Sequence, residues 1–123
     1  MTDTPPLVSV VDDDESVRES LPDLLKEFGY RVRAFPSAED FLASDCVTET
    51  RCLILDVAMP GMSGPDLERE LACQQHKIPI IFITALGEET VRQLLLHGAI
   101  ACLTKPFSDA ALYEALDAAL RAR

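Results

Sequence analysis

Residues 52–64 read CLILDVAMPGMSG, a short apolar run that ends in an aspartate and continues into a loop containing proline and glycine. An apolar run of this length, bounded by turn residues, is typical of a strand that is buried on both faces of a parallel sheet. Pro65 then opens a helix that places Leu67 and Leu71 on one face. The segment is therefore predicted to form one strand–loop–helix unit, with Asp56 at the carboxyl end of the strand.

Similar units lie on both sides of this segment. The other apolar runs cover residues 7–11, 30–35, 78–83 and 101–103, and each is followed by a stretch with helical spacing of apolar residues. Gly29 and Gly98 stand where the first and fourth helices are expected to end, and Pro22 inside the first helix allows a local distortion. Repeated strand–helix units predict an α/β fold built around a parallel sheet.

Length and composition predict one cytoplasmic domain that spans residues 1–123. A chain of 123 residues, 48% of them hydrophobic, can bury roughly two thirds of its unfolded surface in a single core. No apolar run approaches the ~20 residues of a membrane-spanning helix, and residues 1–6 do not resemble a leader peptide. The net charge of −10 disfavours direct binding to nucleic acid or to anionic membranes, because Lys and Arg neutralise phosphate groups.

The cysteines and histidines do not form a recognisable metal-binding pattern. The four cysteines are irregularly spaced at Cys46, Cys52, Cys73 and Cys102. We expect reduced, mostly buried thiols, as is usual in a reducing compartment. His76 and His97 fall at the ends of helical segments and are expected at the surface. ATP and NAD are not expected as ligands, because no glycine-rich nucleotide motif is present.

Polar residues mark the ends of four predicted strands. Asp12 and Asp13 follow the first strand, Asp56 follows the third, Thr84 ends the fourth and Lys105 follows the fifth. Because the carboxyl ends of parallel strands meet at one edge of an α/β sheet, we expect these side chains to share one cleft. Each residue alone has a simpler explanation, since acidic residues often cap helices and lysines are common on surfaces. Their joint placement favours a shared site.

Three carboxylates in one cleft predict a bound cation. Carboxylates repel one another unless a proton or a metal ion relieves the repulsion. Oxygen ligands favour a hard ion such as Mg²⁺, or Mn²⁺ in its place. A metal ion and Lys105 together supply the charge neutralisation that phosphoryl transfer requires, and Thr84 supplies a hydrogen-bond donor for a phosphoryl oxygen.

Four segments resemble the hallmark segments of response-regulator receiver domains, which serve two-component signalling. They are residues 11–14 (VDDD), 55–64 (LDVAMPGMSG), 83–85 (ITA) and 105–107 (KPF), and the resemblance covers essentially the whole chain. Residues 17–21 (VRESL) together with 83–85 are similar to receivers of the FixJ and NarL type. The resemblance implies a CheY-like, flavodoxin-like doubly wound fold, with five parallel strands in the order 2-1-3-4-5 flanked by five helices.

The resemblance also implies roles for the acidic residues. Asp56 corresponds to the phosphoacceptor, which receives a phosphoryl group from a sensor histidine kinase or a histidine phosphotransfer protein. Asp13, Asp56 and the backbone carbonyl of Ala58 correspond to direct metal ligands, and Asp12 corresponds to a carboxylate that acts mainly through water. No activity on a separate substrate is implied, so the domain is expected to be a switch that catalyses only its own phosphorylation and slow dephosphorylation.

The resemblance further concerns the residues that hold and read the phosphoryl group. Thr84 and Lys105 correspond to the residues that contact the phosphoryl oxygens, and the Lys105–Pro106 bond is expected to be cis. Cys102 departs from the pattern, because receivers commonly carry an aromatic residue there that rotates inward as the threonine moves. A small thiol has no ring to rotate, so the usual coupling of threonine and aromatic ring is not expected to operate in its common form.

The output surface implied by the resemblance is the face of the fourth helix, fifth strand and fifth helix. Through it a phosphorylated receiver controls an effector or forms a homodimer. The fourth helix carries a wide apolar surface at Val91, Leu94, Leu95 and Leu96. Leu96 is therefore either exposed for a partner or simply tolerated at the surface.

Three rival interpretations stay open. A phosphatase with an aspartyl-phosphate intermediate needs a second acid two residues after the nucleophile, where this chain has Ala58. A flavodoxin-like FMN module needs a loop rich in hydroxyl groups and glycine after the first strand, where residues 12–15 are acidic. A degenerate receiver that binds partners without being phosphorylated is kept open by Cys102.

Overall fold

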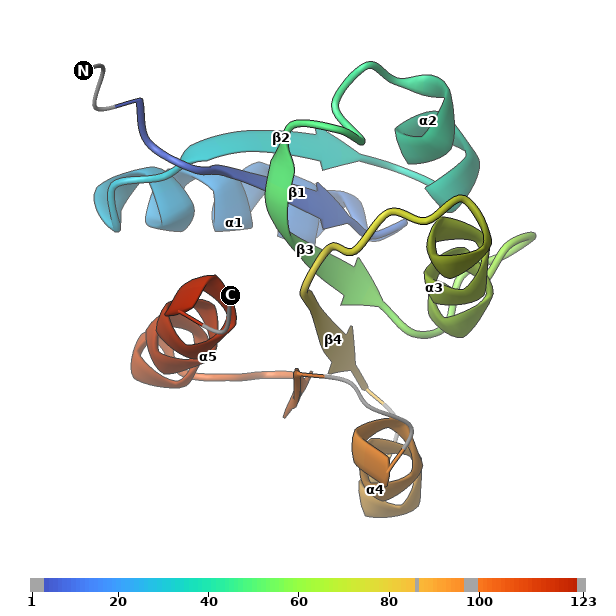
Figure 1. Ribbon diagram of the computed structural model, residues 1–123. Coiled ribbons are helices and arrows are strands. Elements are labelled where there is room, and N and C mark those ends of the chain that lie inside the picture. The colour runs from blue at the N-terminus through green and yellow to red at the C-terminus, as the bar shows by residue number, and fades with distance from the viewer. Residues whose placement is uncertain (1–3, 86, 97–99, 122–123) are drawn as a thin grey trace.

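The computed structural model describes residues 4–85, 87–96 and 100–121 (Figure 1). The strands are β1 Leu7–Val11, β2 Arg31–Phe35, β3 Thr50–Asp56, β4 Ile80–Thr84 and β5 Ala101–Thr104. The helices are α1 Glu15–Glu27, α2 Ala38–Ala43, α3 Gly64–Cys73, α4 Glu88–Leu96 and α5 Asp109–Arg121. Within these residues all strand pairs are parallel and form one sheet in the order β2-β1-β3-β4-β5. The predicted α/β fold and strand order are confirmed.

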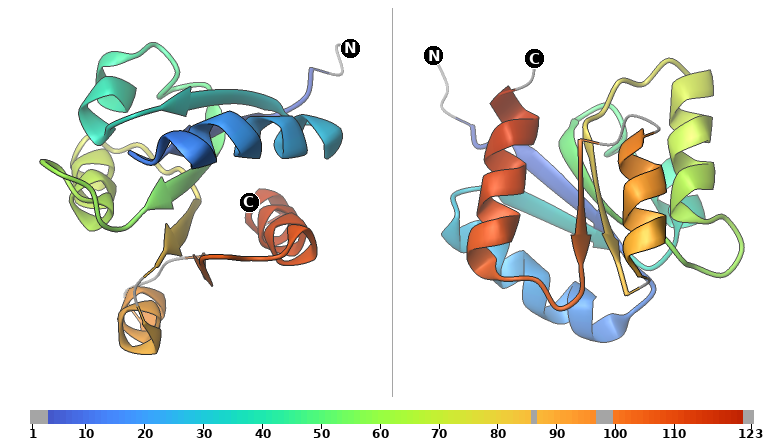
Figure 2. Two further views of the ribbon diagram at one scale, coloured as in Figure 1. Left: turned by 180° about the vertical axis from the view of Figure 1, so that it is seen from behind. Right: turned by 90° about the horizontal axis from the view of Figure 1, so that it is seen from below.

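Helices cover both faces of the sheet, with α1 and α5 on one face and α2, α3 and α4 on the other (Figures 1 and 2). Alternate residues of a strand point to opposite faces. In β3, Leu53 and Leu55 pack toward α2 and α3, whereas Ile54 packs toward α1 and α5. The central strands are almost entirely apolar because both of their faces are covered.

Most element ends agree with the sequence pattern, and the exceptions have local causes. α1 continues through Pro22 without a break and ends before Gly29, whose φ of +98° is the left-handed conformation expected there. β3 begins at Thr50, earlier than predicted, because Thr50 already pairs with Leu7 of β1. β4 begins at Ile80, later than predicted, directly after Pro79, which has no amide hydrogen to pair.

Two expectations at the end of α4 concern residues outside the described ranges. Gly98, predicted to close this helix, and His97, predicted at the surface, belong to that segment. In the described part of the chain, no helix combines the length and hydropathy needed to cross a membrane.

The first residue of α3 lies directly against the carboxyl end of β3. The amide of Gly64 donates to the carbonyl of Val57 at 3.0 Å. A β-carbon on Gly64 would lie 2.4 Å from the carbonyl oxygen of Asp56 and 3.1 Å from the α-carbon of Val57. Ser63 and Asp66 complete a reciprocal capping box at the start of this helix. Glycine is therefore required for α3 to start so close to the backbone of Asp56.

We predict that Gly64→Ala destabilises the domain by about 1–3 kcal/mol, because the clashing atoms belong to the backbone and cannot rotate away. Urea unfolding followed by circular dichroism measures the change. Gly87→Ala is the matched control, since a β-carbon there meets nothing within 4 Å. The control is expected to change stability by no more than about 0.5 kcal/mol. Equal stability of the two variants would contradict the close-approach argument.

Candidate functional site

Carboxylates from β1 and β3 meet at the carboxyl edge of the sheet. Asp12 and Asp13 directly follow β1, and Asp56 is the last residue of β3. One oxygen from each of the three carboxylates lies within 4.8 Å of the others. Asp12 and Asp56 are buried and Asp13 is exposed. Because β1 and β3 flank the point where the strand order reverses, the cluster occupies the usual ligand position of an open α/β sheet.

Lys105 brings a positive charge to this cluster from the end of β5. Its ammonium donates to Oδ2 of Asp12 at 3.0 Å and lies 3.9 Å from Oδ1 of Asp56. Its backbone amide donates to the carbonyl of Thr84 at 2.8 Å, which extends the pairing of β4 and β5 by one residue. The Lys105–Pro106 peptide bond is cis. One ammonium thus faces two buried carboxylates.

The pKa of Asp56 reflects its burial first and the neighbouring charges second. Burial, and then the charge of Asp12, raise the pKa of Asp56 from 3.8 to about 7, and the positive charge of Lys105 offsets only part of this increase. Burial alone would lower the pKa of Lys105, but the hydrogen bond and charge of Asp12, with the charge of Asp56, outweigh it and raise that pKa. Lys105 is therefore charged, and the cluster still carries more negative than positive charge.

Thr84 lies near Asp56, at the carboxyl end of the neighbouring strand β4. It is the last residue of β4 and is buried. Asp56 is opposite Ile83 in the register of β3 and β4, so Thr84 is one residue further toward the carboxyl edge. The structure thus brings the five strand-end residues predicted from the sequence to one edge of the sheet.

The loop after β1 contains a contact that the sequence did not reveal. The side chain of Arg18 donates from Nη1 to the backbone carbonyl of Asp12 at 2.9 Å. The amide of Asp14 donates to Oδ1 of Asp12 at 2.9 Å, and the carboxylate of Asp14 caps α1 by accepting from Ser16. An arginine in the first turn of a helix is common, so the sequence alone does not indicate this contact. In the structure the contact holds the backbone that carries Asp12 and Asp13.

The remaining predicted residues lie around the cluster. Ala58 is exposed in the loop between β3 and α3, two residues beyond Asp56. Cys102 is half-buried in β5, opposite Phe82 of β4, and packs against the core on the side of α2, α3 and α4. His76, at the end of α3, is also half-buried.

All four cysteines are free, as expected. Cys46 and Cys52 are buried, whereas Cys73 is exposed near the end of α3. The expectation of mostly buried thiols therefore holds for two of the four, with Cys102 intermediate and Cys73 an exception.

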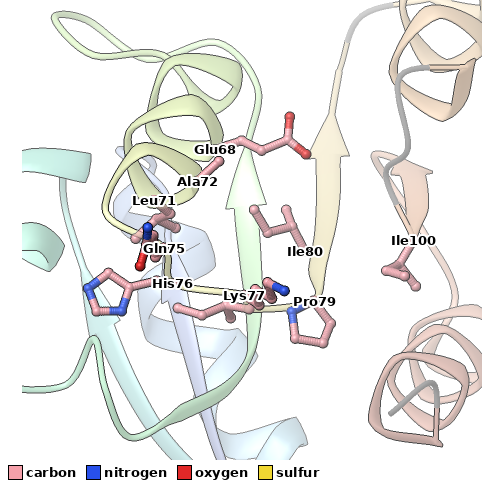
Figure 3. Close-up of a pocket in the computed structure, with 10 residues that line it drawn as sticks. Glu68, Leu71, Ala72, Gln75, His76, Lys77, Pro79, Ile80 and Ile100 are labelled. Atoms are coloured by element: carbon pink, nitrogen blue, oxygen red, sulfur yellow. The ribbon is translucent and has the colours of Figure 1, made fainter.

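Two grooves lie near the sheet edges, and one of them adjoins the cluster. A groove of about 470 Å³ between α1 and the start of α5 is lined by Lys105 together with Val17, Leu21, Leu24 and Phe107. A groove of about 710 Å³ lies at the opposite, amino edge, between the end of α3, the start of β4 and Ile100 (Figure 3). The larger groove is therefore separate from the carboxylate site.

The donor set of the cluster can hold a metal ion. It offers three carboxylates close enough together to share one cation, two of them fixed by burial at the ends of neighbouring strands. Burial and then the charge of Asp12 raise the pKa of Asp56, and Lys105 offsets only part of this increase. A hard cation with oxygen ligands relieves the repulsion between carboxylates.

The fold and site define a doubly wound α/β domain with a carboxylate and lysine site at the carboxyl edge of its sheet. The family model of the response regulator receiver domain matches residues 8–117. The chain therefore belongs to the family of response-regulator receiver domains, as its four motif segments indicated.

Known relatives agree with this assignment. Nodulation protein W from Bradyrhizobium diazoefficiens is 47% identical over 118 residues, which cover 94% of this chain and 52% of that protein. Response regulator protein TmoT from Ectopseudomonas mendocina is 42% identical over 122 residues, which cover 98% of this chain and 56% of that protein. The crystal structure of FixJ-N is 36% identical, with a TM-score of 0.84 over 100% of this chain and 98% of that one. This chain spans about half the length of the curated relatives it matches.

We predict that Asp56→Asn stabilises the metal-free domain at neutral pH. A carboxyl whose pKa is raised on folding contributes stability that is complete below its unfolded pKa, near 3.8, and is lost as the pH rises to about 7. The wild type should therefore lose stability over this range relative to the variant, by about 1 kcal/mol or more.

Urea unfolding in the presence of a chelator, at pH 5 and pH 7.5, measures this difference. Asp23→Asn, which removes an exposed carboxylate of α1 distant from the cluster, is the control and should follow the wild type. If the difference in free energy of unfolding between the wild type and Asp56→Asn does not increase with pH, folding does not raise the pKa of Asp56.

Proposed function

We propose that this chain is the phosphoacceptor switch of a two-component system, with Asp56 as the acceptor. The observation that carries the proposal is the position of Asp56, which shares a cluster with Asp12 and Asp13 and lies 3.9 Å from the ammonium of Lys105. Membership in the receiver family supports it, because receiver domains of response regulators partner with histidine kinases.

In the proposed reaction, a carboxylate oxygen of Asp56 attacks the phosphorus of a phosphohistidine on a sensor kinase or a histidine phosphotransfer protein. A phosphorus–oxygen bond forms and the phosphorus–nitrogen bond breaks, and its electron pair stays on the imidazole nitrogen, which takes up a proton. The product is an acyl phosphate on Asp56. The attacking carboxylate must be ionised, so the charges that surround Asp56 set its reactivity.

Asp13, Asp56 and the carbonyl of Ala58 would hold a divalent cation directly, and Asp12 would hold it through water. Such a cation, Mg²⁺ or Mn²⁺, supplies neutralising charge for the carboxylates and for the phosphoryl oxygens. Lys105, whose ammonium lies 3.0 Å from Oδ2 of Asp12 and 3.9 Å from Oδ1 of Asp56, supplies a second positive charge. These residues position the acceptor and balance charge, which is the main requirement of phosphoryl transfer.

The groove beside Lys105 offers a place for the phosphodonor. It borders the site, is lined by apolar residues of α1 and by Phe107, and has room for side chains of a partner helix. We propose that the donor histidine reaches Asp56 from this side.

The proposed output is a change of the surface formed by α4, β5 and α5. Phosphorylation adds a charge of about −1.5 to −2 beside Thr84 and Lys105, whose side chains then bind the phosphoryl oxygens. Leu96 is 77% exposed and Leu95 is 46% exposed on α4, which leaves apolar surface for an effector or for a second copy of the chain. Cys102 offers no ring to this switch, so Thr84 is proposed to act without an aromatic partner.

The other expectations stay predictions. These are a cytoplasmic location, no direct contact of this chain with nucleic acid or membranes, and no activity on a separate substrate.

Incubation with a small phosphodonor and Mg²⁺ should add the mass of one phosphoryl group to the domain, because Asp56 is the acceptor and the carboxylate cluster binds the metal. Intact-mass spectrometry measures the addition, and a chelator should abolish it. Asp56→Asn is expected to gain nothing, whereas Asp23→Asn is expected to react as the wild type does. Failure of the wild type to gain mass would refute the proposal and favour a degenerate receiver.

Lys105→Ala is expected to accept phosphate more slowly, by about tenfold or more, because one charge that stabilises the transferred group is lost. Once phosphorylated, this variant should dimerise weakly, since the lysine no longer binds the phosphoryl group. Mass spectrometry over time and sedimentation velocity measure the two effects. Lys77→Ala, at the far edge of the sheet, is the control. Normal phosphate-dependent dimerisation of Lys105→Ala would contradict the role given to the lysine.

A further inference from the structure

The loop between β3 and α3 is anchored at both ends, whereas its middle, at Pro60 and Gly61, is exposed. At its start, the carbonyl of Val57 accepts from Gly64, and Met59 is buried in the core beneath α2 and α3. Its middle turns at Gly61, whose φ is +75°. Ala58, the proposed backbone ligand, lies between Asp56 and this turn. Only Met59 and Pro60 separate Ala58 from Gly61, so we expect the conformation of the turn to influence the backbone at Ala58.

One side chain from another element contacts this turn. Oε2 of Glu39, in the first turn of α2, accepts a hydrogen bond from the amide of Met62 at 3.2 Å. A β-carbon on Gly61 would lie 3.0 Å from the same oxygen, which shows that the carboxylate rests directly on the turn. The contact joins positions 23 residues apart in the chain. The acceptor is an oxygen of an exposed side chain, and the donor is a backbone amide of the turn.

α2 provides a firm base for this contact. Its start is capped by Ser37, whose hydroxyl accepts from the amide of Asp40 at 3.1 Å. Ala38 and Phe41, on either side of Glu39 in the helix, are both fully buried. Only the Glu39 side chain itself has rotational freedom, so the helix can hold the carboxylate near Met62 at a modest entropic cost.

We infer that Glu39 is a positioning residue for the acceptor site, because its carboxylate holds the β3–α3 loop in the conformation that presents Ala58 beside Asp56. This inference rests on the proposed function, since it concerns the loop that supplies one ligand of the cation. Glu39 acts through the amide of Met62 and does not itself belong to the carboxylate cluster. The hydrogen-bond acceptor, rather than the negative charge, is the property that matters.

Two substitutions separate these properties. Glu39→Ala removes both the acceptor and the charge, whereas Glu39→Gln keeps an acceptor oxygen and removes the charge. Asp40→Ala is the matched control, because it removes the adjacent exposed carboxylate of the same helical turn. All four proteins are compared for Mg²⁺ affinity by titration calorimetry, for hydrogen exchange of the Met62 amide, and for urea unfolding.

Glu39→Ala is expected to weaken Mg²⁺ binding roughly 3- to 10-fold. Removing a group that directly orients a metal ligand typically weakens metal binding by about 10-fold or more, and Glu39 acts less directly. Exchange of its Met62 amide should be faster, while its unfolding midpoint stays close to that of the wild type. Glu39→Gln and Asp40→Ala should bind Mg²⁺ within about twofold of the wild type.

Wild-type affinity in Glu39→Ala would overturn the inference, and so would a loss in Glu39→Gln as large as that in Glu39→Ala, which would point to charge alone. These outcomes leave the proposed function intact. A wild type that binds no Mg²⁺ and accepts no phosphate overturns the proposed function and, with it, the inference about Glu39.

Discussion

The burial of two carboxylates, Asp12 and Asp56, beside the ammonium of Lys105 is the constraint on which the site depends. The parallel sheet creates it by bringing the ends of β1, β3 and β5 to one edge, where Asp12 and Asp56 are buried. Lys105 pairs closely with Asp12 and more loosely with Asp56, and the pKa of Asp56 rises to about 7. In the proposed function, a cation bound at these carboxylates precedes the transfer of a phosphoryl group to Asp56.

Backbone contacts keep these charges in place. Gly64 lets α3 begin against the carbonyl of Asp56, Arg18 binds the carbonyl of Asp12, and Glu39 binds the amide of Met62. Each contact comes from a helix that follows a strand end, so the layers of the fold support the cluster from both faces of the sheet. Residues outside the carboxylate cluster thus hold its backbone in place through hydrogen bonds and packing.

The sequence predicted the fold and the charged members of the site because both follow from local patterns. Short apolar runs located the strands, and the polar residue that ends each run located the site. The start of β3 was missed because Thr50 is polar and its place in the strand depends on partners distant in the chain: it pairs with Leu7, and its hydroxyl shares a hydrogen bond with Ser9, 41 residues away. Arg18 and Glu39 were not singled out because they contact backbone atoms, and the sequence carries no pattern for such contacts.

Cys102 concerns the proposed transmission of the signal rather than the proposed acceptance of the phosphoryl group. The cysteine lies opposite Phe82 of β4, whose ring is fully buried. Cys102 and Leu94 of α4 pack against the same core. A shift of Thr84 toward a new charge would therefore be felt through the packing of α4 on this core rather than through a moving ring. Since α4 also carries the exposed Leu96, the proposed output would follow from a change in the position of α4 against β5.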